Sequence, residues 1–536
     1  MAHPDHCIPL TTVDAVMTTT PQDQIQGRPG GPMGPDYRLL TVALLALVTI
    51  IAFEAMAIST AMPAVARDLD AVRSYGLAFS FMLTAELLGI VLAGVWADRR
   101  GPLPSLFAGQ LLMVAGSAMA GLAPTFTVLL AGRLTAGLGA GLIIVALYVV
   151  IGRAYPDALR PKVFSWISAA WVLPSLLGPP IAGWLTSTWS WRWVFLIVLA
   201  PIAVTFAVVS TQRDRIRGGS TGDGVVPPDH GVPPDHGVPP DHGVPPDHGV
   251  PPDHGVPPDH GVPPDHGVPP DHGVRPDNGV PPDRSGHRRL ALLGLGVALS
   301  AGAMQWGSAQ LAAAQVFPLT LTALGLTGIA ATAPRLVPAG TLLMSRGLPA
   351  VMMSRFLLTA AFNGALTFIP LMLVSERHLS LTTAGIMLTV GALGWALGSF
   401  VQGHHGLHNR RSELVVAGGA ALTLGILLLA AIAQFGWHYY LVGLATSLSG
   451  LGMGLAMSST SVLSLALSPV SDHGRTSSSL QVADVLGSVL GISAAGAVFA
   501  AMHSTTGSDL HVFVLIWMSL AAVAALVMIG GQRTRT

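Results

Sequence analysis

Residues 40–62 read LTVALLALVTIIAFEAMAISTAM, an apolar run that holds one acidic residue, Glu54. A helix needs about 20 consecutive apolar residues to cross the hydrocarbon core of a bilayer. We predict fourteen such helices, which makes the chain an all-α polytopic membrane protein. They lie at about 40–62, 76–97, 103–122, 125–148, 163–187, 193–211, 290–312, 317–334, 350–374, 381–403, 413–434, 437–465, 476–502 and 510–530.

The composition supports this class. Hydrophobic residues make up 51% of the chain and charged residues 10%, with a mean hydropathy of +0.60, whereas soluble domains carry about 25% charged residues. A net charge of zero argues against a nucleic-acid partner. The only cysteine, Cys7, cannot form an intramolecular disulfide. The first 38 residues have no apolar core and do not resemble a cleaved signal peptide.

The distribution of basic residues predicts the orientation, because cytoplasmic loops are enriched in Lys and Arg. With fourteen helices and the amino terminus inside, most of the 27 basic residues fall in inner loops or inner tails. Two, Arg133 and Arg355, lie in or near helices. The outer loops hold only Arg67, Arg73, Arg192 and Arg377. We therefore expect both termini to lie in the cytoplasm of a cell-membrane protein.

The predicted helices divide the chain into two bundles with an insertion between them. We expect a disordered cytoplasmic tail at 1–38, a six-helix bundle at 39–212, a disordered cytoplasmic linker at 213–289, two extra helices at 290–334, a cytoplasmic connector at 335–349, a second six-helix bundle at 350–530 and a tail at 531–536. Paired prolines in the Gly-Val-Pro-Pro-Asp-His repeats exclude regular helix or sheet from the linker. The repeats are interpreted as a spacer, and their evenly spaced histidines leave metal binding as an alternative.

Three charged or bent segments carry the candidate chemistry of the first bundle. The loop Gly94-Val-Trp-Ala-Asp98-Arg99-Arg100-Gly101 combines an acidic helix end with a tight turn, so it is a candidate conformational switch. Arg133 lies within a predicted span, where an arginine is costly and marks a functional site. Gly137 and Gly141 follow it and allow close helix packing. The fifth span holds prolines and glycines that predict a bend and a hinge: Pro174, Gly178, Pro179 and Gly183.

Three acidic residues also lie within predicted spans: Glu54, Glu86 and Asp484. A carboxyl group in apolar surroundings resists ionisation and so can exchange a proton near neutral pH. It also attracts a cationic substrate. We take Glu54 as the first candidate for proton coupling, Asp484 as the second and Glu86 as the third.

These motifs resemble those of the major facilitator superfamily. The segment Gly94 to Gly101 resembles its signature between the second and third helices, although Pro102 and Leu103 depart from the usual basic residues. Arg133-x-x-x-Gly-x-Gly resembles its fourth-helix motif, whose arginine is implicated in proton transfer. The segment from Gly178 to Gly183 is similar to an element typical of its exporters.

The span count and the first helix, Phe53 to Pro63, resemble the 14-helix drug/proton antiporter branch (the EmrB/QacA type), with Glu54 where that branch has aspartate. The resemblance implies a major facilitator fold with a 6 + 2 + 6 arrangement. It also implies export of small apolar or cationic compounds in exchange for protons, by a protein that we expect to be a monomer without a cofactor.

Other functions remain open from the sequence alone. The same fold could export an endogenous metabolite, a lipid or a siderophore, or could serve as a sensor that moves nothing. An ATP-driven pump is disfavoured, because the only lysine, Lys162, is not in a P-loop sequence. A membrane enzyme is disfavoured too, since the inner-loop histidines lack partners typical of catalytic sites: His404, His405, His408 and His473.

Overall fold

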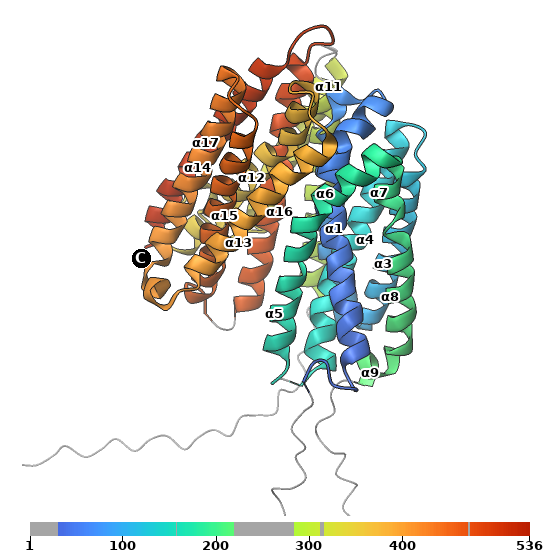
Figure 1. The fold of residues 1–536 in the computed structure, drawn as a ribbon. Helices are drawn as coiled ribbons and strands as arrows, with labels where there is room; N and C mark the ends of the chain where they lie inside the picture. Colours follow the sequence, from blue (N-terminus) through green and yellow to red (C-terminus); the bar gives the residue numbers. More distant parts are fainter. Residues whose placement is uncertain (1–30, 157, 219–283, 311–315, 470–471, 536) are drawn as a thin grey trace, which may run out of the picture. The chain divides into compact units, whose positions relative to one another are not determined.

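The computed structural model describes all residues except 1–30, 157, 219–283, 311–315, 470–471 and 536. Every regular element in the described residues is a helix (Figure 1). Thirteen of these helices are long and apolar enough to cross a membrane by length and composition. The predicted all-α fold class is therefore confirmed. The predicted span 290–312 corresponds to α10 (Arg284–Ala309), which is not among the thirteen, so the count of fourteen crossings stays a prediction.

The first bundle begins directly after a short turn at residues 31–37. Thr41, in the first turn of α1, donates a hydrogen bond to the carbonyl oxygen of Pro32, 2.7 Å away. The elements of this part are α1 (Arg38–Asp68), α2 (Leu77–Arg100), α3 (Pro102–Gly121), α4 (Phe126–Ala154), α5 (Arg160–Ala170), α6 (Val172–Thr188), α7 (Arg192–Leu196), α8 (Leu199–Thr211) and α9 (Arg213–Gly218).

Two of the predicted spans are each divided into two helices. The span 163–187 is split between α5 and α6 at Trp171, and the span 193–211 is split between α7 and α8 at Ile197 and Val198. Each break lies three or four residues before a proline, Pro174 or Pro201. Proline lacks the amide donor for a hydrogen bond to the carbonyl four residues earlier, and its ring crowds that carbonyl. The break in the fifth span lies three residues before Pro174, within the segment in which a bend was predicted.

Helix α4 is packed closely against both α2 and α3 through glycines. A Cβ atom at Gly137 or Gly141 would collide with the α2 backbone at Met82 or Glu86. A Cβ atom at Gly139 would lie 2.6 Å from the carbonyl oxygen of Gly109 on α3. Small residues allow lipid-embedded helices to approach in this way. The close packing agrees with the prediction made from Gly137 and Gly141.

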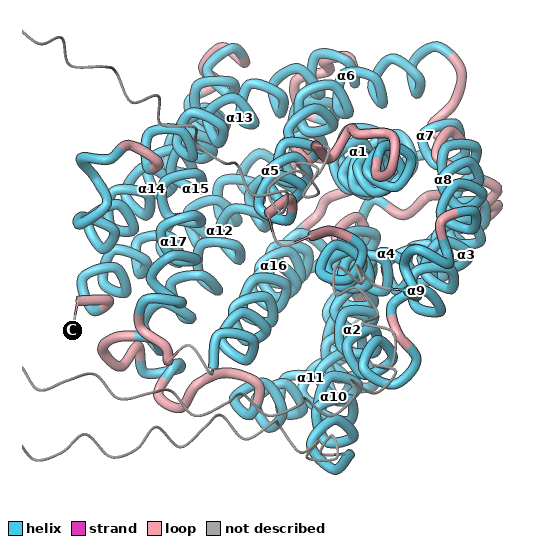
Figure 2. The backbone as a smooth tube through the Cα atoms, turned by 90° about the horizontal axis from the view of Figure 1, so that it is seen from below, coloured by secondary structure: helices cyan, strands magenta, loops and turns pink. Residues whose placement is uncertain are grey.

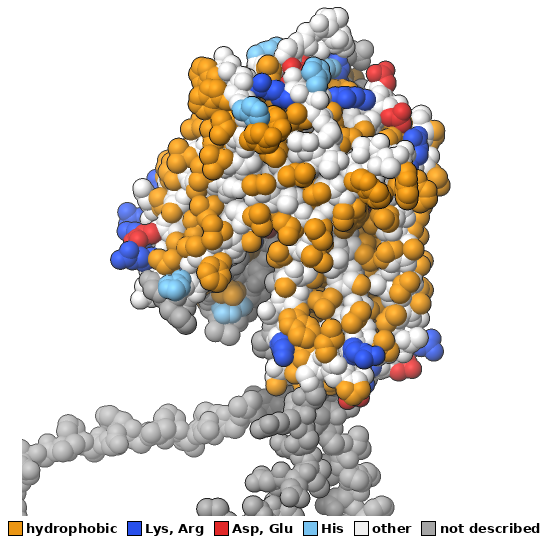
Figure 3. Space-filling view, in the orientation of Figure 1, with side chains coloured by type: hydrophobic (Ala, Val, Ile, Leu, Met, Phe, Trp, Pro, Cys, Tyr) orange, Lys and Arg blue, Asp and Glu red, His pale blue; other side chains and the backbone are white. Residues whose placement is uncertain are grey.

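The second bundle follows two central helices, α10 and α11 (Val316–Thr332), which lie beside α2 and α16 in Figure 2. Apolar residues of α10, α2 and α16 share one buried cluster that includes Leu87, Val297 and Leu486. The remaining long helices are α12 (Leu348–Ser375), α13 (Leu381–Gln402), α14 (Arg411–Phe435), α15 (Tyr440–Ala466), α16 (His473–Met502) and α17 (Leu510–Arg533). Hydrophobic side chains cover the flank of the helices that Figure 3 displays.

The bundles contact each other mainly along two helix pairs. Helix α6 packs on α13, where Thr389 donates a hydrogen bond to the carbonyl oxygen of Leu176 at 2.8 Å. Helix α2 packs on α16, where a Cβ atom at Gly76 would lie 3.2 Å from the Cα of Gly496. Beside this second contact, the ring centroid of Tyr75 lies 5.5 Å from that of Phe368 in α12. The end of the molecule that holds Tyr75 is therefore tightly closed between the bundles.

Most of the predicted linker, including the repeats, lies outside the described residues. Helix occupies part of the predicted linker at each end, as α9 at 213–218 and as the start of α10 from 284. In α9 the acidic Asp214 lies in the first turn and Arg217 in the last, an arrangement that the helix dipole favours.

Candidate transport site

An ion pair is buried in the middle of the first bundle. Nη1 of Arg133 on α4 lies 3.2 Å from Oε1 of Glu54 on α1, and the two side chains are 3% and 1% exposed. Nε of Arg133 donates a hydrogen bond to the carbonyl oxygen of Ala78 at 3.1 Å, and Ser117 donates to Glu54 Oε1 at 3.4 Å. The structure thus joins the first-ranked acid to Arg133, the arginine predicted for proton coupling or substrate binding.

The local sequence explains how Arg133 reaches this position. The glycines that follow it bring α4 against α2, so the guanidinium meets the α2 backbone at Ala78. One atom of the pair has no partner: among the described residues, no hydrogen bond reaches Oε2 of Glu54. A buried carboxylate oxygen without a partner is costly. Glu54 therefore has a free acceptor that a proton or a ligand donor would satisfy.

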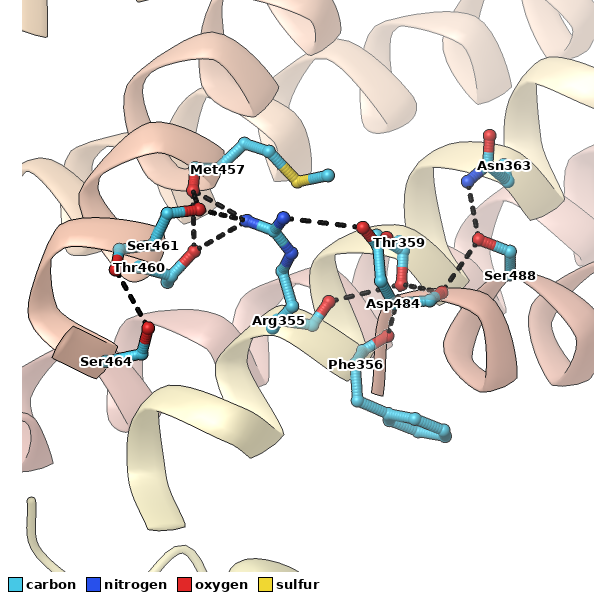
Figure 4. A network of polar contacts seen from close by, with 10 residues as sticks. All are labelled: Arg355, Phe356, Thr359, Asn363, Met457, Thr460, Ser461, Ser464, Asp484 and Ser488. Atoms are coloured by element: carbon cyan, nitrogen blue, oxygen red, sulfur yellow. Dashed lines mark hydrogen bonds and ion pairs between the residues drawn. The ribbon is translucent and has the colours of Figure 1, made fainter. Parts of the chain in front are cut away.

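A second ion pair lies in the other bundle (Figure 4). Nη2 of Arg355 on α12 is 3.4 Å from Oδ2 of Asp484 on α16, and the side chains are 7% and 19% exposed. Nη1 of Arg355 donates to the carbonyl oxygen of Met457 at 2.6 Å, to Thr460 at 3.0 Å and to Ser461 at 3.3 Å. Arg355 is therefore fixed mainly by α15, and Asp484 accepts from only one of its two outer nitrogens.

Polar side chains also support the backbone around Asp484. Thr359 and Ser488 donate hydrogen bonds to the Asp484 carbonyl oxygen at 2.9 and 3.0 Å. Asn363 in turn donates to Ser488 at 2.8 Å. These contacts tie α12 to α16 on the side from which the carboxylate projects, as Figure 4 shows. The backbone of Asp484 is thus held by hydrogen bonds, while its carboxylate is partly exposed.

Glu86 of α2 has a different environment. It is half-buried, and within the described part of the chain no hydrogen bond or ion pair reaches its carboxylate. Its charge interacts with those of Asp484, Arg133 and Glu54. All four residues predicted for coupling or substrate binding therefore belong to one electrostatic array, to which the structure adds Arg355. Three carboxyl groups face two guanidinium groups in this array, so full ionisation leaves one negative charge without a partner.

Comparisons with known proteins match this arrangement of helices. Residues 44–226 match the family model described as Major Facilitator Superfamily. Solved structures share the fold of nearly the whole chain: a mutant of the peptide transporter POT in complex with alafosfalin has a TM-score of 0.62 at 14% identity, with 95% of this chain and 97% of that chain covered. The amino-terminal part of the chain is thus similar to the major facilitator superfamily. The chain is a multi-pass protein of the plasma membrane.

Part of the chain is also similar to two transporters of known name. The chain is 30% identical over 166 residues to the "Multidrug efflux pump SdrM" of Staphylococcus aureus, a match that covers 31% of this chain and 37% of the relative. It is 30% identical over 176 residues to the "Multidrug transporter protein MdtP" of Bacillus subtilis, with 33% and 32% covered. The matched segment spans about a third of the length of these relatives. A D-xylose-proton symporter shares the fold with a TM-score of 0.57 at 14% identity, with 91% and 96% covered.

The superfamily signature after α2 forms a tight turn at Gly101. Gly101 has a φ of +77°, a conformation that a side chain would strain, and it caps α2 directly before Pro102 begins α3. By contrast, a Cβ atom at Gly94 would meet no atom within 4 Å. Arg99 is exposed at the end of α2. Asp98 lies in the last turn of α2, and its side chain is outside the described residues.

The exporter-like element of α6 lies between α1 of its own bundle and α13 of the other. A Cβ atom at Gly178 would contact Phe53 of α1 at 3.6 Å. A Cβ atom at Gly183 would lie 2.7 Å from the α13 backbone at Thr382, and one at Gly385 would lie 2.5 Å from the carbonyl oxygen of Pro179. Pro174, at the start of the same helix, is buried. Of the predicted hinge residues, Pro179 and Gly183 thus lie at a contact between the two bundles.

Arg355 is a site residue that the sequence did not predict. Its position, in the second turn of a predicted span, looked like a helix-end arginine, whereas the structure buries it beside Asp484. The signal that could have found it is the same as for Arg133, because an arginine inside an apolar span needs a partner. No group of three metal-ligating side chains occurs in the residues that the structure describes, and the side chains of His405 and His408 lie outside those residues.

Proposed function

We propose that this protein is a secondary exporter that exchanges protons for small cationic or amphipathic compounds, drugs among them, by alternating access. The observation that carries the proposal is the charged array of Glu54, Arg133, Glu86, Arg355 and Asp484, which spans both bundles. Ionisable residues inside a membrane bundle are costly and mark ion or proton pathways. The named multidrug relatives and the proton symporter with the same fold support this choice.

Glu54 is the proton-coupling group in this proposal. Arg133 favours its ionised form, while burial and the unpartnered Oε2 favour its protonated form. A carboxyl group balanced in this way changes protonation when its surroundings change. A movement of α4 relative to α1 would separate Arg133 from Glu54 and raise the proton affinity of Glu54. The return of Arg133 to Glu54 would release the proton.

Glu86 takes the positive charge of the substrate. It is the carboxylate of the array without an arginine partner, and it is accessible where Glu54 is sealed. The array has one surplus negative charge, so one monovalent organic cation or one proton makes it neutral. Occupancy by substrate and by proton would then be mutually exclusive, which is the requirement for exchange.

The bend in α6 supplies the movement. Prolines free backbone groups and weaken the helix, so a helix bends most easily there. Because Gly183 and Pro179 contact α13, a change in the bend would alter the contact between the bundles. Pseudo-symmetric bundles that rock about a central site give alternating access.

The test is transport by purified protein in liposomes with an imposed pH gradient, measured with a lipophilic fluorescent cation and an internal pH indicator. We expect the wild type to accumulate the cation against proton flow and Glu54→Gln to abolish this coupling. Ser59→Ala in α1 is a matched control, because Ser59 bonds only to the Met56 carbonyl oxygen of its own helix.

The outcomes separate the parts of the proposal. Coupled movement that survives Glu54→Gln would contradict the assignment to Glu54 and move the proton to Asp484 or Glu86. Cation movement that ignores the pH gradient would contradict proton exchange. A wild type that moves no cation, with or without the pH gradient, would refute drug export. The search would then turn to an endogenous substrate.

A further inference from the structure

A small polar cavity lies where α2, α10 and α16 meet, beside the close contact of Gly76 with Gly496. It offers about 10 Å³ to the centre of a water molecule, close to what one water needs. The exchange mechanism proposed above uses none of the residues that line it. Four buried polar side chains from the three helices line the cavity: Ser80, Gln305, Ser308 and Ser493.

Gln305 of α10 is fully buried, and only one end of its amide group is bonded. Its Nε2 donates hydrogen bonds to α2, to Oγ1 of Thr84 at 2.7 Å and to the carbonyl oxygen of Ser80 at 3.5 Å. Within the described part of the chain, no hydrogen bond reaches its Oε1. A buried amide oxygen without a donor is costly. Because Gln305 lines the cavity, a small molecule there can supply the missing donor.

The three serine hydroxyl groups need a donor too. Each already donates to a carbonyl oxygen of its own helix: Ser80 to that of Gly76 at 3.1 Å, Ser308 to that of Gln305 at 3.0 Å and Ser493 to that of Val489 at 2.6 Å. A hydroxyl group that donates in this way keeps only its lone pairs for a further partner. The occupant of the cavity must therefore be a hydrogen-bond donor.

The charges around the cavity favour a neutral donor over a cation. Oxygen ligands alone would also suit a hard metal ion. However, Arg73 lines the cavity, and α2 begins beside it at Leu77 with the positive end of its helix dipole. None of the described residues that line the cavity is acidic. A neutral donor that fits the space of one water molecule is water itself.

We propose that this cavity binds one water molecule, which donates hydrogen bonds to Oε1 of Gln305 and to Oγ of Ser493 and so links α10 to α16. Buried water typically bonds to about three polar groups that would otherwise lack partners. Here these groups come from the first bundle, a central helix and the second bundle. The water therefore completes the closed contact between the bundles without leaving a buried acceptor unpartnered.

The water also gives α10 a defined part in closing this end. Direct contacts hold α10 to α2, through the amide of Gln305 and through the rings of Trp306 and Phe81, whose centroids are 6.4 Å apart. Among the residues that the structure describes, no direct hydrogen bond joins α10 to α16. Helix α10 is thus a fixed neighbour of α2, and the water is its removable link to the second bundle.

The first test is a cryo-electron microscopy map of the full-length protein in lipid nanodiscs, at a resolution that shows ordered water. We expect one peak within hydrogen-bond distance of Gln305 Oε1 and of Ser493 Oγ. Gln305→Met keeps the length of the side chain without its amide group, so it should remove the peak. The map needs no transported compound, so its outcome is independent of the proton exchange proposed above.

The second test measures how firmly the closed end is held. Spin labels on cysteines introduced at Arg67 and Thr506, with Cys7→Ser, report the distance between the bundles by double electron–electron resonance. Gln305→Met should raise the ratio of open to closed molecules by about fivefold, as expected for one lost hydrogen bond. Adding Ser493→Ala should raise it no further, because both side chains act through one water.

Matched controls separate the water from general effects of substitution. Ser459→Ala is the control for Ser493→Ala, because both serines are buried and each donates at 2.6 Å to a carbonyl oxygen of its own helix. Ser459 of α15 does not line the cavity. Gln310→Met removes an exposed amide group directly after α10. Neither control should change the distances.

The remaining outcomes contradict the proposal. A map that resolves other buried waters but shows no peak here would refute the site. A peak that grows when rubidium replaces sodium in the buffer would identify a cation. Unchanged distances in Gln305→Met, despite loss of the peak, would refute the role in closing. Additive effects of Gln305→Met and Ser493→Ala would show that the two side chains act separately.

Discussion

The two bundles each bury one arginine beside one carboxylate, but they hold these pairs differently. In the first bundle, Glu54 and Arg133 are 1% and 3% exposed, and Arg133 is fixed by a backbone carbonyl oxygen of α2. In the second, Asp484 is 19% exposed, and Arg355 is fixed by hydroxyl and carbonyl oxygens of α15. The ion-pair distances, 3.2 and 3.4 Å, are nearly equal.

The two ion pairs have similar N–O distances but differ in how deeply the carboxylate is buried. We therefore expect burial, rather than distance, to determine the different roles of the two pairs. A sealed carboxylate that loses its arginine is left as an uncompensated charge, whereas a partly exposed one can be solvated. The first pair is therefore suited to couple protonation to a helix movement. The second pair is suited to shape a site that stays accessible. Four predictions can break or refine this contrast, beginning with the largest expected effect.

Arg133→Gln should destabilise the protein by about 3–5 kcal/mol, because it leaves Glu54 buried without its counter-charge. Arg355→Gln should cost only about 1–3 kcal/mol, since Asp484 keeps access to solvent. Thermal unfolding of the purified proteins in detergent measures both. The double variant Glu54→Gln with Arg133→Gln should recover most of the loss, and equal losses for the two arginines would contradict the contrast.

Asp484→Asn should slow cation transport by about fivefold, equivalent to about 1 kcal/mol in the barrier, and leave the dependence on the pH gradient intact. The reason is that Asp484 contributes charge to the array while Glu54 still exchanges the proton. Initial rates in the liposome assay, at several gradients, measure this. A complete loss of proton dependence would give the coupling role to the second bundle instead.

Thr460→Val should lower stability by about 1 kcal/mol, because it removes one acceptor of the Arg355 guanidinium. Thr423→Val on α14 is the control, since that hydroxyl bonds only to the Gly419 carbonyl oxygen of its own helix. The difference in unfolding midpoint between the two variants isolates the Arg355 contact. Identical midpoints would mean that the hydroxyl does not support Arg355.

Ser117→Ala should have the smallest effect, about 0.5 kcal/mol. Its hydroxyl lies 3.4 Å from Glu54, near the limit of a hydrogen bond, and Arg133 remains in place. The same unfolding measurement checks it. A loss as large as that of Arg133→Gln would show that the serine, rather than the arginine, holds the carboxylate.

The sequence predicted the helices well because a membrane span must be long and apolar, a property of consecutive residues. It also indicated Glu54, Glu86, Arg133 and Asp484 as candidate functional residues, since charges in such spans are rare, and their roles stay predictions. It could not predict which charges pair, because partners on α1 and α4, or on α12 and α16, are set by packing between distant segments. The glycines beside Arg133 predicted close contact but not its target, Ala78.

The boundaries within spans were the weakest predictions. The breaks at Trp171 and at Ile197 follow from Pro174 and Pro201, but an apolar run hides them from a hydropathy pattern. The two glycines of the superfamily-like signature differ in whether the backbone needs them. Gly101 needs its positive φ, whereas Gly94 faces open space, so sequence similarity alone does not tell which glycine the backbone requires.

The glycine contacts of α4 have a practical consequence for measuring motion. Helices α2, α3 and α4 approach so closely at Gly137, Gly139 and Gly141 that we expect them to shift together. Spectroscopic labels placed on two of these helices should keep a constant separation through the whole cycle. Such a pair provides an internal ruler, against which a changing distance between α6 and α13 can be calibrated in the same sample.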